Sequence, residues 1–200
     1  MLENYLIDCC SPTLASLKSG SLFNCRHNNE QASISECVSE WNTEFSGRGI
    51  RMCILRMTDH SALIYVYRET SLSRSLSDPE VKSFLEGYGY EVFSCCNGCG
   101  DSECNECSID RCLEHLSRRI SRSGGEFPHE IGVFLDYPLD DVRGFIENNG
   151  RNCKAVGMWK VYGDEASARK RFARFTKCTS VYSDLWRSGR RSVLQLTVAG

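Results

Sequence analysis

The sequence predicts an α+β fold in which mixed sheets are flanked by helices. Residues 50–57 and 62–67 are apolar runs rich in β-branched and aromatic side chains, which is typical of strands. Residues 34–45 and 168–186 instead repeat apolar side chains at steps of three and four, which predicts amphipathic helices. With 200 residues, 41% hydrophobic and 25% charged, the chain can bury the core that such a fold needs.

The net charge and the hydropathy of the chain argue against a nucleic-acid-binding, secreted or membrane-spanning protein. The formal net charge is −2, which gives no general attraction to nucleic acid or to an anionic membrane. Residues 1–8 lack the basic region of a signal peptide, and no apolar run approaches the roughly 20 residues that span a bilayer. We therefore expect a cytoplasmic protein with no membrane partner.

The first helix is expected to begin at Ser11-Pro12. Serine is a good N-cap, and proline suits the first helical position because its missing N–H costs nothing there. Cys10 would then precede a helix start, where the helix dipole favours a thiolate. The alternative is that Cys10 packs as a small apolar residue, and the sequence leaves both readings open.

The remaining elements follow from periodicity, capping residues and turns. Helices are expected after Asp78, Pro138 and Asp164, each ended by a glycine, and a polar, basic helix over residues 113–122. The expected strands are residues 22–25, 50–57, 62–67, 90–93, 131–135, 155–162 and 193–198. The second and third of these strands should form a hairpin.

A weak internal repeat divides the chain. Residues 80–89 align with residues 141–150, and each segment follows and precedes an expected strand. We therefore expect two loosely related α/β halves, residues 1–94 and 126–200. Residues 95–125 between them form a cysteine-rich loop and a basic helix that have the character of an insertion.

The 13 cysteines carry the sharpest chemical signal in the sequence. In a reducing compartment they indicate metal binding or thiol chemistry rather than disulfides. Two Cys-x-x-Cys pairs lie close together, and four such thiolates can hold a tetrahedral zinc ion or an iron–sulfur cluster. The expected ligands are Cys96, Cys99, Cys104 and Cys107, with Cys95 and Cys112 as alternates. A redox dithiol and a reduced loop without a ligand are the other readings.

Phe127-Pro128-His129-Glu130 is a second candidate site. A histidine and a glutamate could act as acid and base or as metal ligands. An enzyme with Cys10 as nucleophile and His129 or Glu130 as base would need these groups within hydrogen-bond reach. The structural alternative is that Glu130 forms a salt bridge and His129 acts as a cap, because adjacent residues of a strand point to opposite faces.

A row of basic residues lies off the apolar stripe of the last long helix. The row consists of Arg169, Lys170, Arg171, Arg174 and Lys177, and Arg187, Arg190 and Arg191 extend it. Most rows of this kind are solvated faces, although this one could bind an anion or nucleic acid. Because no nucleic-acid motif accompanies it, we do not expect a nucleic-acid partner, and an interaction module remains the alternative.

Several motifs taken together resemble a known family. They include Cys10-Ser11-Pro12-Thr13-Leu14-Ala15, Leu63-Ile64-Tyr65-Val66-Tyr67-Arg68, Phe127-Pro128-His129-Glu130-Ile131-Gly132, Tyr137-Pro138-Leu139 and Trp159-Lys160-Val161-Tyr162. The family they resemble is an uncharacterised domain of unknown function from anaerobic, clostridia-like bacteria, and the resemblance covers nearly the whole chain. That family tends to have glycine where this chain has Asp136, and the cysteine-dense segment lies outside its pattern.

The resemblance also indicates which residues could share a function in the family and in which kind of physiology the family acts. Residues that match the shared pattern are Cys10, Thr13, Lys18, His129, Glu130, Tyr137, Asp141, Trp159 and Lys160. Association of the family with ferrous-iron uptake and flavodoxin genes implies iron or redox physiology, with a redox or iron-transport protein as partner. The leading hypothesis is therefore a metal-binding or thiol-redox accessory protein.

Overall fold

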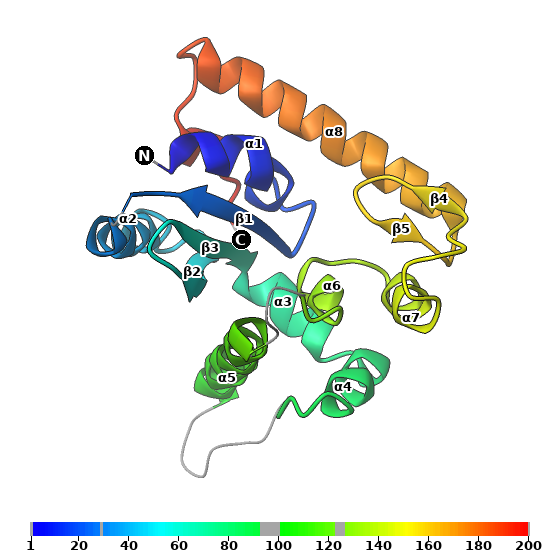
Figure 1. The fold of residues 1–200 in the computed structure, drawn as a ribbon. Coiled ribbons are helices and arrows are strands. Elements are labelled where there is room, and N and C mark those ends of the chain that lie inside the picture. The colour runs from blue at the N-terminus through cyan, green and yellow to red at the C-terminus, as the bar shows by residue number, and fades with distance from the viewer. Residues whose placement is uncertain (1, 29, 93–100, 123–126, 200) are drawn as a thin grey trace.

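The computed structural model describes residues 2–28, 30–92, 101–122 and 127–199, without the side chains of residues 101–107. Within these residues a three-stranded sheet forms the middle layer, and helices cover both of its faces (Figure 1). The α+β class is confirmed, and the larger sheet and a second, two-stranded sheet are both antiparallel.

The central strand of the larger sheet is β3 (Ser61–Arg68), which pairs with β1 (Gly20–Arg26) and β2 (Ile50–Met57). Alternate residues of β3 enter two different cores, so that Ile64 faces one and Tyr65 the other. Because both faces are covered, β3 is apolar along nearly its whole length rather than alternating with polar residues.

One face of the sheet is covered by helices from both ends of the chain. They are α1 (Glu3–Leu14), α2 (Gln31–Glu44), α8 (Glu165–Arg187) and α9 (Val193–Leu196). α8 lies along α1, and its first turns reach the small sheet (Figure 1). None of the described helices is long and apolar enough to cross a membrane.

The other face is covered by helices from the middle of the chain. They are α3 (Glu69–Leu76), α4 (Pro79–Glu86), α5 (Asp101–Arg122), α6 (Ile131–Phe134) and α7 (Leu139–Glu147). The Tyr65 hydroxyl donates to the Phe134 carbonyl at 2.5 Å, which attaches α6 to the sheet. The small sheet, β4 (Ala155–Val156) and β5 (Lys160–Val161), is a hairpin beside α7.

Several sequence predictions are confirmed. β2 and β3 form the expected hairpin, and α2 carries the expected apolar stripe. The carboxylates of Asp78 and Asp164 accept backbone N–H groups at the starts of α4 and α8, as expected of N-caps. The single strand expected over residues 155–162 is wrong in part, because the segment turns back at residues 157–159 and forms two short antiparallel strands.

The predicted helix start at Ser11-Pro12 is wrong, because both residues lie near the end of α1. The helix begins at Glu3 instead, and the apolar residues along it and directly before it are fully buried: Leu2, Leu6, Ile7, Cys10 and Leu14. This stripe supplies packing that outweighs the N-cap preference of Ser11. Ser11 instead donates its hydroxyl to the Ile7 carbonyl at 2.5 Å.

Three strand predictions are also wrong. Residues 131–135 contain α6, residues 193–198 contain α9, and Tyr90–Val92 form no strand; Phe93 lies outside the described residues. Short apolar runs fit a strand and a buried helical turn equally well, so periodicity alone does not separate them. At α9 the overlooked signal is a capping box of Ser192 and Gln195.

The two helices of the internal repeat are present. Both α4 and α7 are followed by a glycine with positive φ, at 82° for Gly89 and 70° for Gly150. The helices also contact each other, since Arg143 pairs with Glu80 at 3.8 Å. However, the expected strand before the second helix is α6, so the repeat does not extend to the strands.

Candidate functional site

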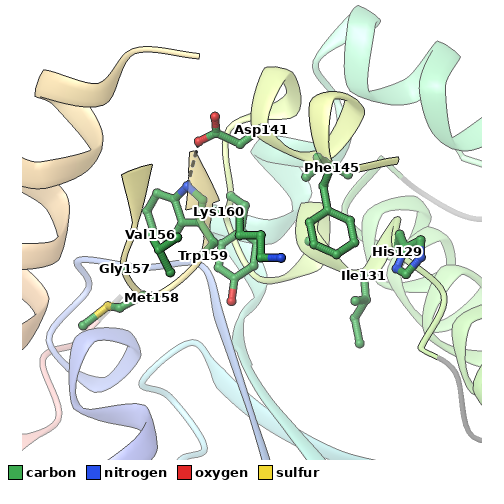
Figure 2. A pocket seen from close by; sticks show the side chains of 12 residues that line it. His129, Ile131, Asp141, Phe145, Val156, Gly157, Met158, Trp159 and Lys160 are labelled. Atoms are coloured by element: carbon green, nitrogen blue, oxygen red, sulfur yellow. Dashed lines mark hydrogen bonds between the residues drawn. The ribbon is translucent and has the colours of Figure 1, made fainter. Parts of the chain in front are cut away.

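Five of the residues that carry the family resemblance line one pocket. The pocket lies between α6, α7 and the β4–β5 hairpin, and its volume is about 390 Å³, which suits a small molecule (Figure 2). The five residues are His129, Tyr137, Asp141, Trp159 and Lys160. The fold thus gathers side chains that the sequence places on separate segments.

Asp141 holds the wall of this pocket in place. Its buried carboxylate accepts the Trp159 indole N–H at 2.6 Å and the backbone N–H groups of Tyr162 and Gly163 at 2.7 Å each. Gly144, three residues further along α7, lets the hairpin approach, because a Cβ there would lie 2.5 Å from Tyr162. The Asp141 carboxylate therefore has a structural role in positioning the hairpin.

Aromatic rings form the walls. The rings of Tyr137 and Trp159 stack with centroids 4.8 Å apart, and the His129 imidazole meets Phe145 edge-on at 4.9 Å. Such surfaces favour a flat, largely apolar ligand. Among the described residues, no hydrogen bond or ion pair engages the exposed His129 side chain, so its ring nitrogens remain available.

Lys160 places a cation at the pocket. Its ammonium donates to the Gly150 carbonyl at 2.7 Å and lies 5.6 Å from the Phe145 ring centroid. In Figure 2 the Lys160 side chain extends toward Phe145, and His129 lies beyond that ring. No carboxylate in the described part of the chain lies within ion-pair distance of Lys160, although an ammonium has three donors.

Four pocket residues were missed by reasoning from sequence: Phe145, Val156, Gly157 and Met158. Val156 is 71% exposed and Met158 46% exposed, although both are large apolar residues. An apolar run around Gly157, directly before Trp159, was the available signal.

Glu130 has the structural role that the sequence left open. It is 1% exposed, forms an ion pair with Arg119 and accepts the Tyr90 hydroxyl at 3.1 Å. Burial, together with the neighbouring Glu130 carboxylate, raises the pKa of Tyr90. Glu130 lines a second cavity of about 500 Å³, and His129 lies at the junction of this cavity with the first.

Cys10 is separated from both candidate bases. It belongs to the core under α1, whereas Tyr90, the partner of Glu130, belongs to the core on the opposite face of the sheet. Burial raises the pKa of the Cys10 thiol, which opposes thiolate formation. The structure therefore does not bring Cys10, His129 and Glu130 together.

The structure describes only part of the cysteine-rich segment. Cys95, Cys96 and Cys99 lie outside the described residues, and the described backbone places Cys104 and Cys107 in the first two turns of α5. Cys112 packs in the apolar core, and burial raises its pKa to about 12, which makes it a poor alternate ligand. The described side chains contain no group of three or more potential metal ligands.

The basic row of α8 is partly neutralised within the molecule. Arg169 pairs with Glu165, Arg171 with Asp136 and Arg187 with Asp8. The exposed basic residues of the row and its extension that form no ion pair among the described residues are Lys170, Arg174, Lys177, Arg190 and Arg191. Binding of an anion or nucleic acid by this face stays a prediction.

Comparison with known proteins identifies the family. A family model described as protein of unknown function (DUF3793) matches residues 6–197. Neither the curated proteins nor the solved structures contain a match. The matched region covers nearly the whole chain, including every residue of the pocket, and the chain therefore belongs to the DUF3793 family.

Proposed function

We propose that this protein binds a small, flat, largely apolar molecule that carries an anionic group, in the pocket between α6, α7 and the β4–β5 hairpin. The observation that carries the proposal is Lys160, a cation among aromatic walls and without a carboxylate partner in the described part of the chain. His129 adds a second nitrogen donor at the same pocket. A few placed polar groups in an otherwise apolar cavity are typical of ligand sites.

The anionic character of the ligand follows from charge. Asp141 is the one carboxylate on the pocket wall among the described residues, and its oxygens already accept three N–H groups. A ligand carboxylate or phosphate could accept from the remaining donors of Lys160 and from His129. A neutral ligand could accept these hydrogen bonds but would leave the charge of Lys160 unbalanced.

A fragment screen by protein-observed NMR tests this function. Flat anionic fragments should shift the indole N–H signal of Trp159, and their neutral isosteres should bind more weakly. Lys160→Gln should weaken the anionic hits by roughly tenfold or more. The proposal would be contradicted if all fragments bound at other surfaces, or if Lys160→Gln did not change the affinity of the anionic fragments.

Lys154→Gln is the matched control. Lys154 belongs to the same segment and also donates to a glycine carbonyl, that of Gly163 at 2.8 Å, but it does not line the pocket. Its removal should leave fragment binding unchanged. Equal effects of the two substitutions would indicate a general loss of charge or of hairpin stability.

A second candidate function is metal binding by the cysteine-rich segment, as zinc or an iron–sulfur cluster in a redox or iron-linked accessory role. The observation that favours it is the position of Cys104 and Cys107 on α5, because residues three apart share a helix face and the start of a helix favours thiolates. Their partners would be Cys96 and Cys99, as the sequence spacing predicts.

Metal analysis after anaerobic purification tests this second function. About one zinc ion or one iron–sulfur cluster per chain is expected from four thiolates, with a visible spectrum in the second case. Replacing Cys104 and Cys107 by Ser should abolish metal binding, whereas replacing Cys37 and Cys178 by Ser should leave the metal content unchanged. A metal-free preparation would contradict this function and leave the pocket proposal untouched.

A further inference from the structure

A separate cavity of about 440 Å³ shares no lining residue with the pocket described above. It is formed by the segment between α1 and β1, by α3, by the start of α4 and by Asp136 before α7. Its walls differ from those of the first pocket, because serines and charged residues replace the aromatic rings.

Lys18 is the central feature of this cavity. Its side chain is partly buried, and its ammonium lies 5.6 Å from the centroid of the Tyr137 ring. Within the described residues it makes no ion pair and no hydrogen bond. Asp136 acts on Lys18 electrostatically, but it lies beyond ion-pair distance and is paired with Arg171, so the partly buried ammonium has no ion pair of its own in the described part of the chain. A bound anion would supply one.

Further donors surround Lys18. Ser71, Arg74 and Ser75 are spaced so that they share one face of α3, and all three line the cavity. Arg74 has no ion pair among the residues that the structure describes. Ser19, the chain neighbour of Lys18, also lines the cavity, and its buried side chain interacts with the Asp136 carboxylate.

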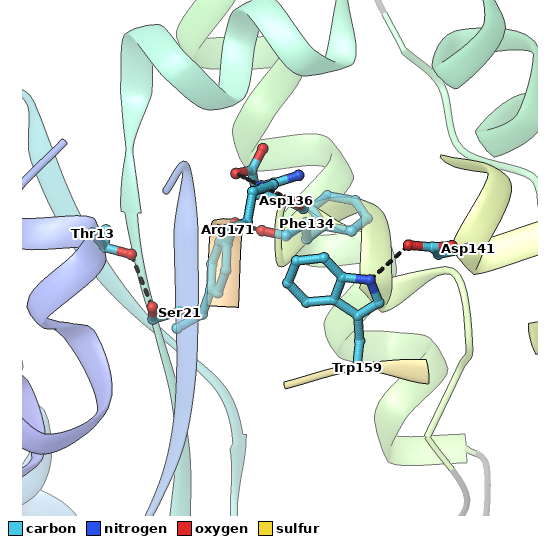
Figure 3. A network of polar contacts seen from close by, with 8 residues as sticks. Thr13, Ser21, Phe134, Asp136, Asp141, Trp159 and Arg171 are labelled. Carbon is cyan, nitrogen blue, oxygen red and sulfur yellow. Dashed lines mark hydrogen bonds and ion pairs between the residues drawn. The ribbon is translucent and has the colours of Figure 1, made fainter. Parts of the chain in front are cut away.

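Two carboxylates also line the cavity, and both are already engaged. Asp136 pairs with Arg171 at 2.5 Å (Figure 3). Asp78 accepts the N–H groups of Glu80 and Val81 at the start of α4, at 2.9 and 3.3 Å. The groups left for a ligand are therefore two cations and several hydroxyls, which is a donor set for an oxyanion.

We propose that this cavity binds a tetrahedral oxyanion, either inorganic phosphate or the phosphate group of a small metabolite, through Lys18, Arg74 and the serine hydroxyls. The site is independent of the pocket that holds Lys160. Guanidinium and ammonium groups together with hydroxyls are the partners that phosphate oxygens take in proteins.

Titration calorimetry at constant ionic strength tests the proposal, with inorganic phosphate and glycerol 3-phosphate as probes and chloride as the reference. Binding of either probe to the full chain is expected. Tighter binding of inorganic phosphate would identify the free ion as the ligand, and tighter binding of the ester would identify a phosphorylated metabolite. Absence of binding by both probes at millimolar concentration would overturn the proposal.

Two substitutions in the cavity test whether the phosphate probes bind there. Arg74→Gln alters an exposed side chain and should preserve the fold, while Lys18→Met removes the partly buried cation. Each should weaken probe binding by roughly tenfold or more. Arg174→Gln on α8 and Lys160→Gln should leave it unchanged, which separates this site from the first pocket. Binding that survives both Arg74→Gln and Lys18→Met would also overturn the proposal.

Discussion

The thiol of Cys10 and the amine of Lys18 lie on either side of the bend that ends α1, and burial changes the pKa of both. Burial raises the pKa of Cys10, and the neighbouring Lys18 only partly offsets it. Burial lowers the pKa of Lys18 from 10.5 to about 8, and Cys10 and Asp136 only partly offset that change. In each case the low-dielectric surroundings disfavour the charged form.

The Cys10 thiol should therefore be unreactive in the folded protein. At neutral pH its alkylation by iodoacetamide is expected to be at least about tenfold slower than that of the exposed Cys9, because access and thiolate population are both low. Tandem mass spectrometry of the peptide that contains both residues measures the two rates. In denaturant the rates should converge. Faster alkylation of Cys10 than of Cys9 would restore the hypothesis of a cysteine nucleophile.

The lowered pKa of Lys18 predicts a pH-dependent stability. Between about pH 8 and 10.5 the unfolded chain holds a proton on this amine that the folded chain has lost. The free energy of unfolding of the wild type, relative to Lys18→Met, should therefore rise with pH through this window, by about 3 kcal/mol. Urea titrations at both ends of the window measure this difference.

The comparison with Lys18→Met isolates the lysine. Asp136 and Arg171 face Lys18 and are present in both proteins, as are the tyrosines and cysteines whose pKa values burial raises. A difference that stays constant or falls with rising pH would show that Lys18 keeps its proton in the folded state.

Asp136 has a left-handed backbone conformation, and its side chain forms an ion pair. It has φ of 60°, a conformation that glycine adopts without cost and that aspartate tolerates better than most residues. The aspartate of this chain adds an ion pair with Arg171 (Figure 3).

Among the elements, α7 and the β4–β5 hairpin act as a unit. Each strand of the hairpin has two residues, too few to be stable by backbone pairing alone. The hairpin is held instead by Asp141 and by the packing of Trp159 against Tyr137 and Phe172. The pocket wall therefore depends on a carboxylate of a neighbouring helix.

Asp141→Asn should loosen this unit. An amide can accept some of the three N–H groups, but its own NH₂ would then face a donor, so a loss of roughly 2 kcal/mol in unfolding free energy is expected. Asp140→Asn, at the exposed neighbouring position, should change stability by less than about 0.5 kcal/mol. Urea denaturation measures both, and equal losses would contradict the anchoring role of Asp141.

For the whole molecule, Arg68 connects parts of the chain that are distant in sequence. From the end of β3 its guanidinium donates to the carbonyls of Thr13, Leu14 and Val198 at 2.6 to 2.7 Å. The first two belong to the end of α1, where the helix dipole favours a cation. One side chain thus joins the first helix, the central strand and the segment after α9.

Arg68→Lys should destabilise the fold although the charge is kept. A single ammonium on a shorter side chain cannot reach the three carbonyls in the same geometry, so roughly 3 kcal/mol of unfolding free energy should be lost. Arg48→Lys is the control, because Arg48 makes one bond, to Thr197 at 3.0 Å, and should cost less than about 1 kcal/mol. Chemical denaturation checks this, and a negligible loss for Arg68→Lys would show that the three bonds are dispensable.

Most elements with a long repeating pattern or a marked start were predictable from sequence. The start expected at Ser11-Pro12 is the exception, because the apolar stripe upstream of it packs into the core and extends the helix to Glu3. The α2 stripe, the β2–β3 hairpin and the N-caps Asp78 and Asp164 depend on neighbouring residues, and each is where the sequence predicts it. The two strands that are helices in the structure were predicted on short apolar runs, residues 131–135 and 193–198, in which packing decides between strand and helix.

The sequence by itself determined the α+β class, the apolar stripes, the pairs of cysteines and the residues that carry the family resemblance, because these are properties of local order and composition. Only the tertiary structure decided that His129, Trp159 and Lys160 share a pocket, that Cys10 lies apart from Glu130, and that Lys18 is partly buried and forms no ion pair among the described residues. Distances and burial depend on how α6, α7, the hairpin and the α1–β1 segment pack together. No local pattern contains that information.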